Sequence, residues 1–205
     1  MSKLIREWNG NKKSVSVMLG MSTTWHPEQR AGGDYYTTDP KAVKEFLDKF
    51  FIPRESVIWE PACGSGNISK VLEENGYNVV STDLYDRGYG VCGFDFLETE
   101  KVPDNCSLII TNPPYSLADE FILHALEILP YNGRTAFLLN LSYLAGQKRY
   151  KEIYSKRFLD YVYIYSHRIN CYKNNEDTGH SSPVNYGWFV FRKDNFITEP
   201  KIEWI

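Results

Sequence analysis

The stretch Ser56-Val-Ile-Trp-Glu-Pro-Ala-Cys-Gly-Ser-Gly-Asn67 decides the fold that this sequence predicts. Its first four residues form a short apolar run typical of a buried strand, and residues 60–67 form a glycine-rich turn before an amphipathic helix. Glycines between a strand and a helix let a ligand approach the backbone closely. The turn has neither the GxxxxGK[ST] nor the GxGxxG pattern, so it does not indicate a phosphate-binding loop.

Glu60 stands directly before this turn and indicates what kind of ligand the turn favours. A carboxylate at this position suits a ligand that carries an ammonium group and hydroxyls rather than phosphates. The alternative is a structural role, in which Glu60 caps the turn and contacts no ligand.

The alternation of strand and helix continues outward from the turn. Strands are predicted at 56–59, 77–82, 107–111, 134–139, 160–165 and 188–191, and helices after Asp39-Pro40, from the turn to Gly76, at 118–129 and at 146–158. Residues 166–185 are predicted to be irregular, and short strands are expected before Asp95 and near the C-terminus. The pattern predicts an α/β fold with a parallel sheet covered by helices on both faces, in which ligands bind beyond the carboxyl ends of the strands.

Polar residues follow three of the predicted strands. Asp83 ends the strand at 77–82, where a carboxylate can accept two ribose hydroxyls. Asp95-Phe96 pairs a carboxylate for an adenine amino group with a ring for the base face, although a turn aspartate and a core phenylalanine are equally consistent.

Asn112-Pro-Pro-Tyr115 follows the buried strand at 107–111. The prolines hold the backbone extended and remove two N–H donors, which leaves the Asn112 side-chain oxygen and the Pro113 carbonyl as acceptors. Tyr115 adds a planar face. The motif predicts a grip on a planar group that carries an –NH2.

Taken together, these motifs resemble those of the S-adenosylmethionine-dependent amino-methyltransferases, and are most similar to the adenine-N6 nucleic-acid methyltransferases, including small phage-type enzymes. The likeness covers residues 35–192 and includes Tyr35-Tyr-Thr-Thr-Asp-Pro40, Leu138-Leu-Asn-Leu-Ser-Tyr-Leu-Ala-Gly146 and Tyr186-Gly-Trp-Phe-Val-Phe191. It implies a Rossmann-like class I methyltransferase fold, with a mostly parallel seven-stranded sheet, helices on both faces and an antiparallel last strand.

The resemblance also implies a cofactor and a site. The cofactor would be S-adenosyl-L-methionine, with S-adenosyl-L-homocysteine as its product, and the reaction would be methyl transfer to the N6 amino group of adenine in DNA, with RNA as an alternative. The residues implied in catalysis are Asn112, Pro113, Pro114 and Tyr115. Those implied in cofactor binding are Tyr36, Thr37, Thr38, Glu60, Pro61, Ala62, Cys63, Gly64, Gly66, Asp83, Leu84, Asp95, Phe96 and Asn112.

The distribution of charge along the chain indicates which residues could contact nucleic acid. The 205 residues carry a net charge of −3, but residues 146–173 hold seven Lys or Arg against two Asp or Glu. This basic segment either meets phosphates or is an ordinary solvated helix face. The candidate nucleic-acid contacts are Lys148, Arg149, Lys151, Arg168 and Lys173.

The scattered cysteines, and the lack of any apolar run near the ~20 residues of a membrane helix, predict a reduced, cytoplasmic protein of a bacterial or phage-infected cell, with no metal and no membrane partner. Residues 1–34 are expected to form an arm or loop and residues 35–205 the catalytic domain, without a separate large target-recognition domain. Rival functions are methylation of another planar amino or amide group, as in the glutamine-N5 and guanine-N2 methyltransferases, and a non-catalytic binding module. Target sequence, strandedness, association with a restriction nuclease and oligomeric state stay open.

Overall fold

The computed structural model describes residues 35–173, 184–194 and 199–205, so the predicted arm at 1–34 lies outside the described residues. The helices and strands are β1 Tyr36–Thr38, α3 Pro40–Leu47, β2 Val57–Glu60, α4 Asn67–Glu74, β3 Asn78–Ser81, β4 Cys106–Thr111, α5 Ala118–Ile128, β5 Arg134–Asn140, α6 Gln147–Glu152, β6 Leu159–Ile164, β7 Cys171–Lys173, β8 Tyr186–Arg192 and β9 Lys201–Trp204. Short 3-10 helices lie at η1 Phe96–Glu98, η2 Tyr115–Leu117, η3 Leu141–Leu144 and η4 Tyr154–Lys156.

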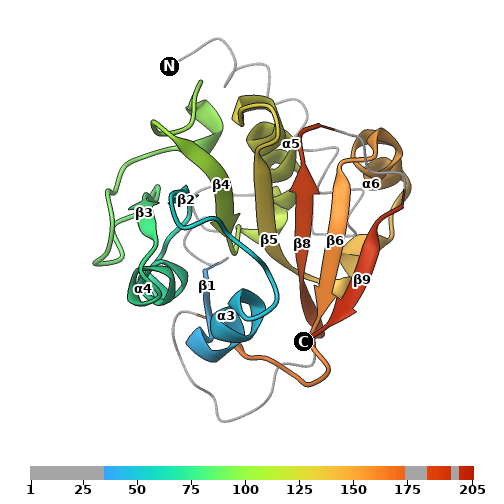
Figure 1. Ribbon diagram of the computed structural model, residues 1–205, viewed down its shortest axis with the longest axis horizontal. Coiled ribbons are helices and arrows are strands. Elements are labelled where there is room, and N and C mark those ends of the chain that lie inside the picture. The colour runs from blue at the N-terminus through green and yellow to red at the C-terminus, as the bar shows by residue number, and fades with distance from the viewer. Residues whose placement is uncertain (1–34, 174–183, 195–198) are drawn as a thin grey trace, which may run out of the picture. The chain divides into compact units, whose positions relative to one another are not determined.

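Seven strands form one sheet in the order β3-β2-β4-β5-β8-β6-β9 (Figure 1). All pair in parallel except β8, which is antiparallel to both β5 and β6. This confirms the predicted mostly parallel sheet. The antiparallel strand contains Trp188–Phe191 as expected, but β9 follows it in the chain and pairs in parallel with β6 at the sheet edge.

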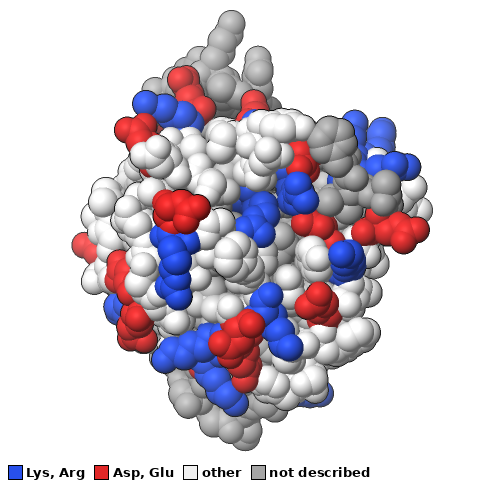
Figure 2. Space-filling model, in the orientation of Figure 1, with Lys and Arg blue, Asp and Glu red and all other residues white. Residues whose placement is uncertain are grey.

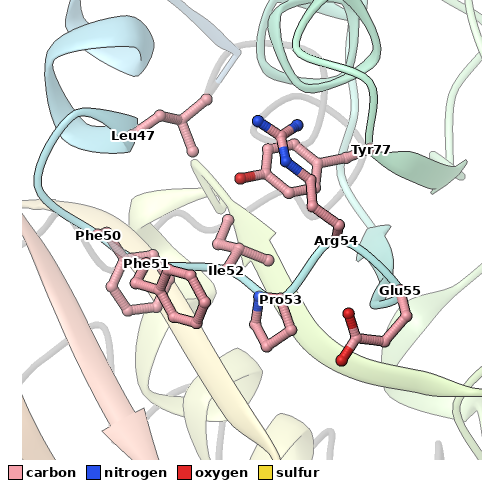
Figure 3. Close-up of a pocket in the computed structure, with 8 residues that line it drawn as sticks. All are labelled: Leu47, Phe50, Phe51, Ile52, Pro53, Arg54, Glu55 and Tyr77. Carbon is pink, nitrogen blue, oxygen red and sulfur yellow. The ribbon is translucent and has the colours of Figure 1, made fainter.

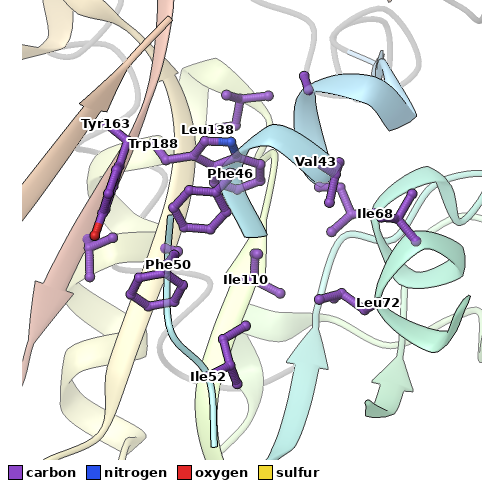
Figure 4. Close-up of a cluster of buried hydrophobic side chains, with 14 of the residues drawn as sticks. Val43, Phe46, Phe50, Ile52, Ile68, Leu72, Ile110, Leu138, Tyr163 and Trp188 are labelled. Carbon is purple, nitrogen blue, oxygen red and sulfur yellow. The ribbon is translucent and has the colours of Figure 1, made fainter. Parts of the chain in front are cut away.

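Helices cover both faces of this sheet, as the alternating pattern predicts. On one face α3 and α4 pack against β2, β4, β5 and β8, where the ring of Phe46 stacks 4.6 Å from Trp188 and 4.8 Å from Phe50 (Figure 4). On the other face α5 and the buried Ile153 pack against the same strands. The buried Trp188 indole donates to Tyr165 Oη at 2.7 Å, so the polar atom in this core is satisfied.

Local signals place several elements where the sequence predicts them. Asp39 caps α3 by accepting from Lys41 N at 2.9 Å, and Pro40 takes the first helical position. The short strand expected before Asp95 is reduced to a single bridge between Thr82 and Val91.

Two local predictions were wrong. The helix expected at 146–158 ends at Glu152, because the chain turns at the buried Ile153 and continues as the short η4. The segment 166–185, expected to be irregular, contains β7, which pairs antiparallel with β1. That pairing joins residues more than 130 positions apart, so no local pattern reveals it.

Candidate active site

The glycine-rich turn joins β2 to α4 at the carboxyl edge of the sheet. Gly64 and Gly66 have φ values of +55° and +80°, a region that side chains rarely adopt. A Cβ on Gly64 would lie 2.6 Å from the Tyr35 ring, and one on Gly66 would lie 2.5 Å from the Tyr89 ring. The turn is therefore confined to glycine at both positions.

Glu60 ends β2 and is 2% exposed. Its Oε2 accepts from Ser69 N at 2.8 Å and from the Ser69 hydroxyl, which satisfies the third residue of α4. Burial raises the pKa of Glu60 to about 8. Glu60 thus caps the start of α4, and its contact with a ligand stays a prediction.

Asp83 lies directly against the turn. Its Oδ2 accepts from Gly64 N and its Oδ1 from Tyr85 N, both at 2.8 Å. Each carboxylate oxygen has a second lone pair, so these bonds leave capacity for ligand hydroxyls. The neighbouring Leu84 is 46% exposed, which makes it an apolar surface beside this carboxylate.

Asp95 and Phe96 play different parts. Asp95 Oδ1 caps η1 by accepting from Leu97 N at 3.0 Å, and the residue stays partly exposed. Phe96 is buried among Trp59 and Phe121, with ring centroids 5.2 and 4.8 Å away. Phe96 is therefore a core residue with almost no surface for a ligand, while the contact of the partly exposed Asp95 with the cofactor stays a prediction.

The strand β1 connects the turn to the Asn-Pro-Pro-Tyr motif. On one side Tyr35 Oη donates to Ser65 Oγ at 2.9 Å, and the Thr38 carbonyl accepts from Asn67 Nδ2 at 2.9 Å. On the other side Asn112 Nδ2 donates to the Tyr36 carbonyl and to Thr38 Oγ1, each at 3.2 Å. Hydrogen bonds therefore join the segment 35–38 both to the glycine-rich turn and to Asn112.

Asn112 Oδ1 is the unusual atom of this site. It is buried and has no hydrogen-bond partner among the described residues. An unsatisfied buried acceptor costs about 1–3 kcal/mol, and a ligand that supplies a donor would recover that cost.

Tyr115 is already flanked by aromatic rings. Its centroid lies 5.1 Å from Tyr36 and 6.1 Å from Tyr186. Its hydroxyl is buried, and burial together with the nearby Cys171 and Tyr186 raises its pKa well above the usual value. The sequence did not single out Tyr186 or Cys171 as site residues. The pairing of β7 with β1 places Cys171 opposite Thr38, and Tyr186 begins β8 opposite Asn140 of β5.

The thiol of Cys63, inside the turn, is also held in its neutral form. Burial, with a smaller contribution from Glu60 and Asp83, raises its pKa to about 12. Pro61 is buried and Ala62 partly buried in the same turn.

Two of the basic residues in this segment, Lys148 and Arg149, are paired with acidic residues of the chain. Arg149 lies 3.3 Å from Asp119, and its guanidinium is 4.3 Å above the Tyr143 ring. Lys148 pairs with Asp119 and with Glu152. Lys151 and Arg168 are exposed, and Lys173 lies in β7. The face seen in Figure 2 likewise mixes both signs of charge, with no large patch of one sign.

A pocket of about 490 Å³ lies elsewhere (Figure 3). Residues 50–55, Leu47 and Tyr77 line it, and these precede β2 and β3. It therefore opens at the amino edge of the sheet, opposite the motif residues. Among the described residues no three His, Cys, Asp or Glu side chains gather as a metal site, and none of the helices is long and apolar enough to cross a membrane.

Comparisons with known proteins identify the fold. No model of a protein family and no curated sequence matches the chain. A type I restriction-modification methyltransferase subunit from Streptococcus thermophilus matches with a TM-score of 0.56 and 17% identity, over 84% of this chain and 47% of that one. A protein described as a class I S-adenosylmethionine-dependent methyltransferase from Listeria monocytogenes matches with 0.54 and 12%, over 80% and 61%. A protein described as a hemolysin from Lactococcus lactis matches with 0.54 and 16%, over 78% and 88%.

These likenesses show that the chain has the Rossmann-like fold of class I methyltransferases, as predicted. The chain spans only 61% of the Listeria protein and about half of the Streptococcus one. A shared fold does not by itself fix an activity.

Proposed function

We propose that this protein transfers a methyl group from S-adenosylmethionine to the N6 amino group of adenine in DNA. The observation that carries the proposal is the buried Asn112 Oδ1, an acceptor without a partner among the described residues, at the carboxyl end of β4. It supports a substrate group that donates hydrogen bonds, which an exocyclic amine does and a carbonyl does not.

The residues around the turn fit S-adenosylmethionine in their chemistry. Asp83 and the partly exposed Asp95 provide oxygens for hydroxyls and an amino group, and Leu84 provides apolar surface. The turn lacks the lysine of a phosphate-binding loop, which agrees with a cationic ligand. When bound, this cofactor supplies a methyl group already activated on a sulfonium.

The chain's own task is then to hold and activate the amine. Adenine N6 is a poor nucleophile because its lone pair is delocalised into the ring. Hydrogen bonds from N6 to Asn112 Oδ1 and to the Pro113 carbonyl would favour a tetrahedral nitrogen and localise that lone pair in the transition state. N6 would form its bond to the methyl carbon as the sulfonium–carbon bond breaks, and would then lose one proton to solvent. Correct positioning of the reacting groups can lower the barrier by about 7–11 kcal/mol.

Asn112→Ala is the variant that tests this chemistry. We expect methyl transfer to fall by at least about tenfold, because the acceptor is lost, while cofactor affinity stays nearly unchanged. The protein would be incubated with labelled methyl donor and unmethylated DNA, RNA or protein, followed by mass analysis of nucleosides and amino acids. Asn78→Ala, at an exposed position at the amino end of β3, serves as the matched control.

Label in N6-methyladenine supports the proposal. Label found only in glutamine or guanine would show that the substrate is not adenine. Full turnover in the Asn112→Ala variant would show that Asn112 takes no part in the reaction.

A further inference from the structure

The two N–H groups of the Asn112 amide are both bound by β1. One points to the Tyr36 carbonyl oxygen and the other to Thr38 Oγ1, each over 3.2 Å. Oδ1 is thereby the one polar atom of this side chain left without a partner among the described residues. The pairing of the two donors therefore decides that the oxygen, and not the nitrogen, is the atom of the amide left unpaired.

The Tyr36 carbonyl sets the direction, because a carbonyl oxygen only accepts hydrogen bonds. Rotating the amide by half a turn would bring Oδ1 against that oxygen and present N–H groups to the substrate instead. The Thr38 hydroxyl reinforces the observed orientation by accepting the second N–H. Thr38 is 2% exposed, so water does not compete for its hydroxyl.

The position of β1 is fixed independently of Asn112. The Thr38 carbonyl accepts from Asn67 Nδ2 at 2.9 Å, which ties β1 to the start of α4. The strand also pairs with β7 along its whole length, from Tyr36 opposite Lys173 to Thr38 opposite Cys171. The acceptors that hold the amide thus belong to an anchored element.

We propose that Thr38, together with the Tyr36 carbonyl, is a positioning residue that keeps Asn112 Oδ1 toward the substrate and so makes the site select an amine over a carbonyl. This role rests on the proposed function and differs from the one that the family resemblance implies for Thr38, contact with the cofactor. The two roles separate experimentally, since one acts on turnover and the other on cofactor affinity.

Thr38→Val tests the proposal because it removes the hydroxyl and keeps the shape. We expect kcat on adenine to fall by about threefold to tenfold, with the Kd of S-adenosylmethionine unchanged and Thr38→Ser close to the wild type. Thr135→Val is the control, because Thr135 is equally buried in β5 and its hydroxyl has no hydrogen-bond partner among the described residues. A weakened Kd with unchanged kcat would overturn the proposal in favour of a cofactor contact, and equal losses in the Ser and Val variants would also overturn it.

A double-mutant cycle tests whether Thr38 acts through Asn112. In an Asn112→Ala background, Thr38→Val should cause no further loss of turnover, whereas an additional loss equal to that of the single variant would contradict the inference. Thermal melts will show whether Thr38→Val lowers turnover only by unfolding the protein. In that case the turnover of Thr38→Ser is compared with that of Thr38→Ala instead.

A measurement without any substrate separates this inference from the proposed function. In a protein labelled with 15N-asparagine, the Asn112 side-chain amide, assigned by its loss in Asn112→Ala, should exchange slowly with solvent. Thr38→Val should speed that exchange, and Thr135→Val should not. If the exchange rate is unchanged in Thr38→Val, the positioning role is overturned even if the protein methylates adenine. If the wild type methylates no adenine, the proposed function is overturned whatever the exchange rate.

Discussion

Burial strongly changes the titration of the Glu60 carboxyl. Its pKa rises from 4.5 to about 8. Between these two values the folded protein holds a proton that the unfolded chain has lost. The free energy of unfolding therefore falls as the pH rises through this window, by at most about 1.4 kcal/mol per pH unit.

Glu60→Gln should remove this dependence, because glutamine does not titrate and keeps an oxygen for the Ser69 N–H. We expect the stability of the wild type relative to the variant to decline from pH 5 to pH 8 and to level off above the pKa of about 8. Urea unfolding of both proteins across this range measures it. Two curves that stay parallel would mean that Glu60 titrates normally.

The sequence picked out candidate site residues, but it did not determine how each of them packs. Asn112 stands out because two prolines follow it, and Gly66 because a strand and helix flank it. Asp95-Phe96 and Glu60 each had a structural alternative, and the structure puts Phe96 in the core and Glu60 on Ser69. Which alternative holds depends on three-dimensional neighbours, which a local pattern does not contain.

The basic side chains of helix α6 are of two kinds. Some are paired within the chain, and others are exposed to solvent. Arg149 donates to the Tyr143 and Ala145 carbonyls and pairs with Asp119 in the first turn of α5. Arg149→Ala should lower the free energy of unfolding by about 1–3 kcal/mol, because these partners lose charge-assisted bonds. Urea unfolding is the measurement, and an unchanged midpoint would show that the contacts contribute little.

Lys151→Ala on the same helix should behave in the opposite way. Its side chain is exposed, so stability should change by less than about 0.5 kcal/mol. If it contacts phosphate, DNA affinity will fall and the salt slope of binding will decrease by about one. Filter binding over a range of salt concentrations measures this slope. A slope identical to that of the wild type would show that Lys151 is an ordinary solvated residue without a phosphate contact.

The sequence mispredicted two features of the elements, the end of α6 and the existence of β7, and each has a physical reason. The 146–158 stretch reads as one helix because its residues have adequate helix propensity, but packing of Ile153 in the core interrupts it. β7 exists only because β1 is there to pair with it. Strands such as β4 and β5 are buried on both faces, so they appear in the sequence as continuous apolar runs and can be predicted locally.

At the scale of the whole molecule, alternation predicted the sheet and both helical layers. The resemblance implied an antiparallel last strand, but the position of β8 between β5 and β6 was not predicted and is seen only in the structure. This order leaves the ends of β2, β3 and β4 adjacent at one edge, which is where Glu60, Asp83 and Asn112 come together. A ligand bound there contacts several strands at once, so its binding should stabilise the entire fold.

Ligand-dependent melting tests that consequence. At about 100 times its Kd, S-adenosylmethionine should add about 2.7 kcal/mol to the free energy of unfolding, since it binds the folded chain alone. ATP shares the adenosine but carries phosphates in place of the methionine part, and the turn has no phosphate-binding lysine to receive them. It should therefore raise the melting temperature far less, and Asp95→Ala should reduce the effect of S-adenosylmethionine at the same concentration. Equal stabilisation by ATP would indicate a nucleotide site instead.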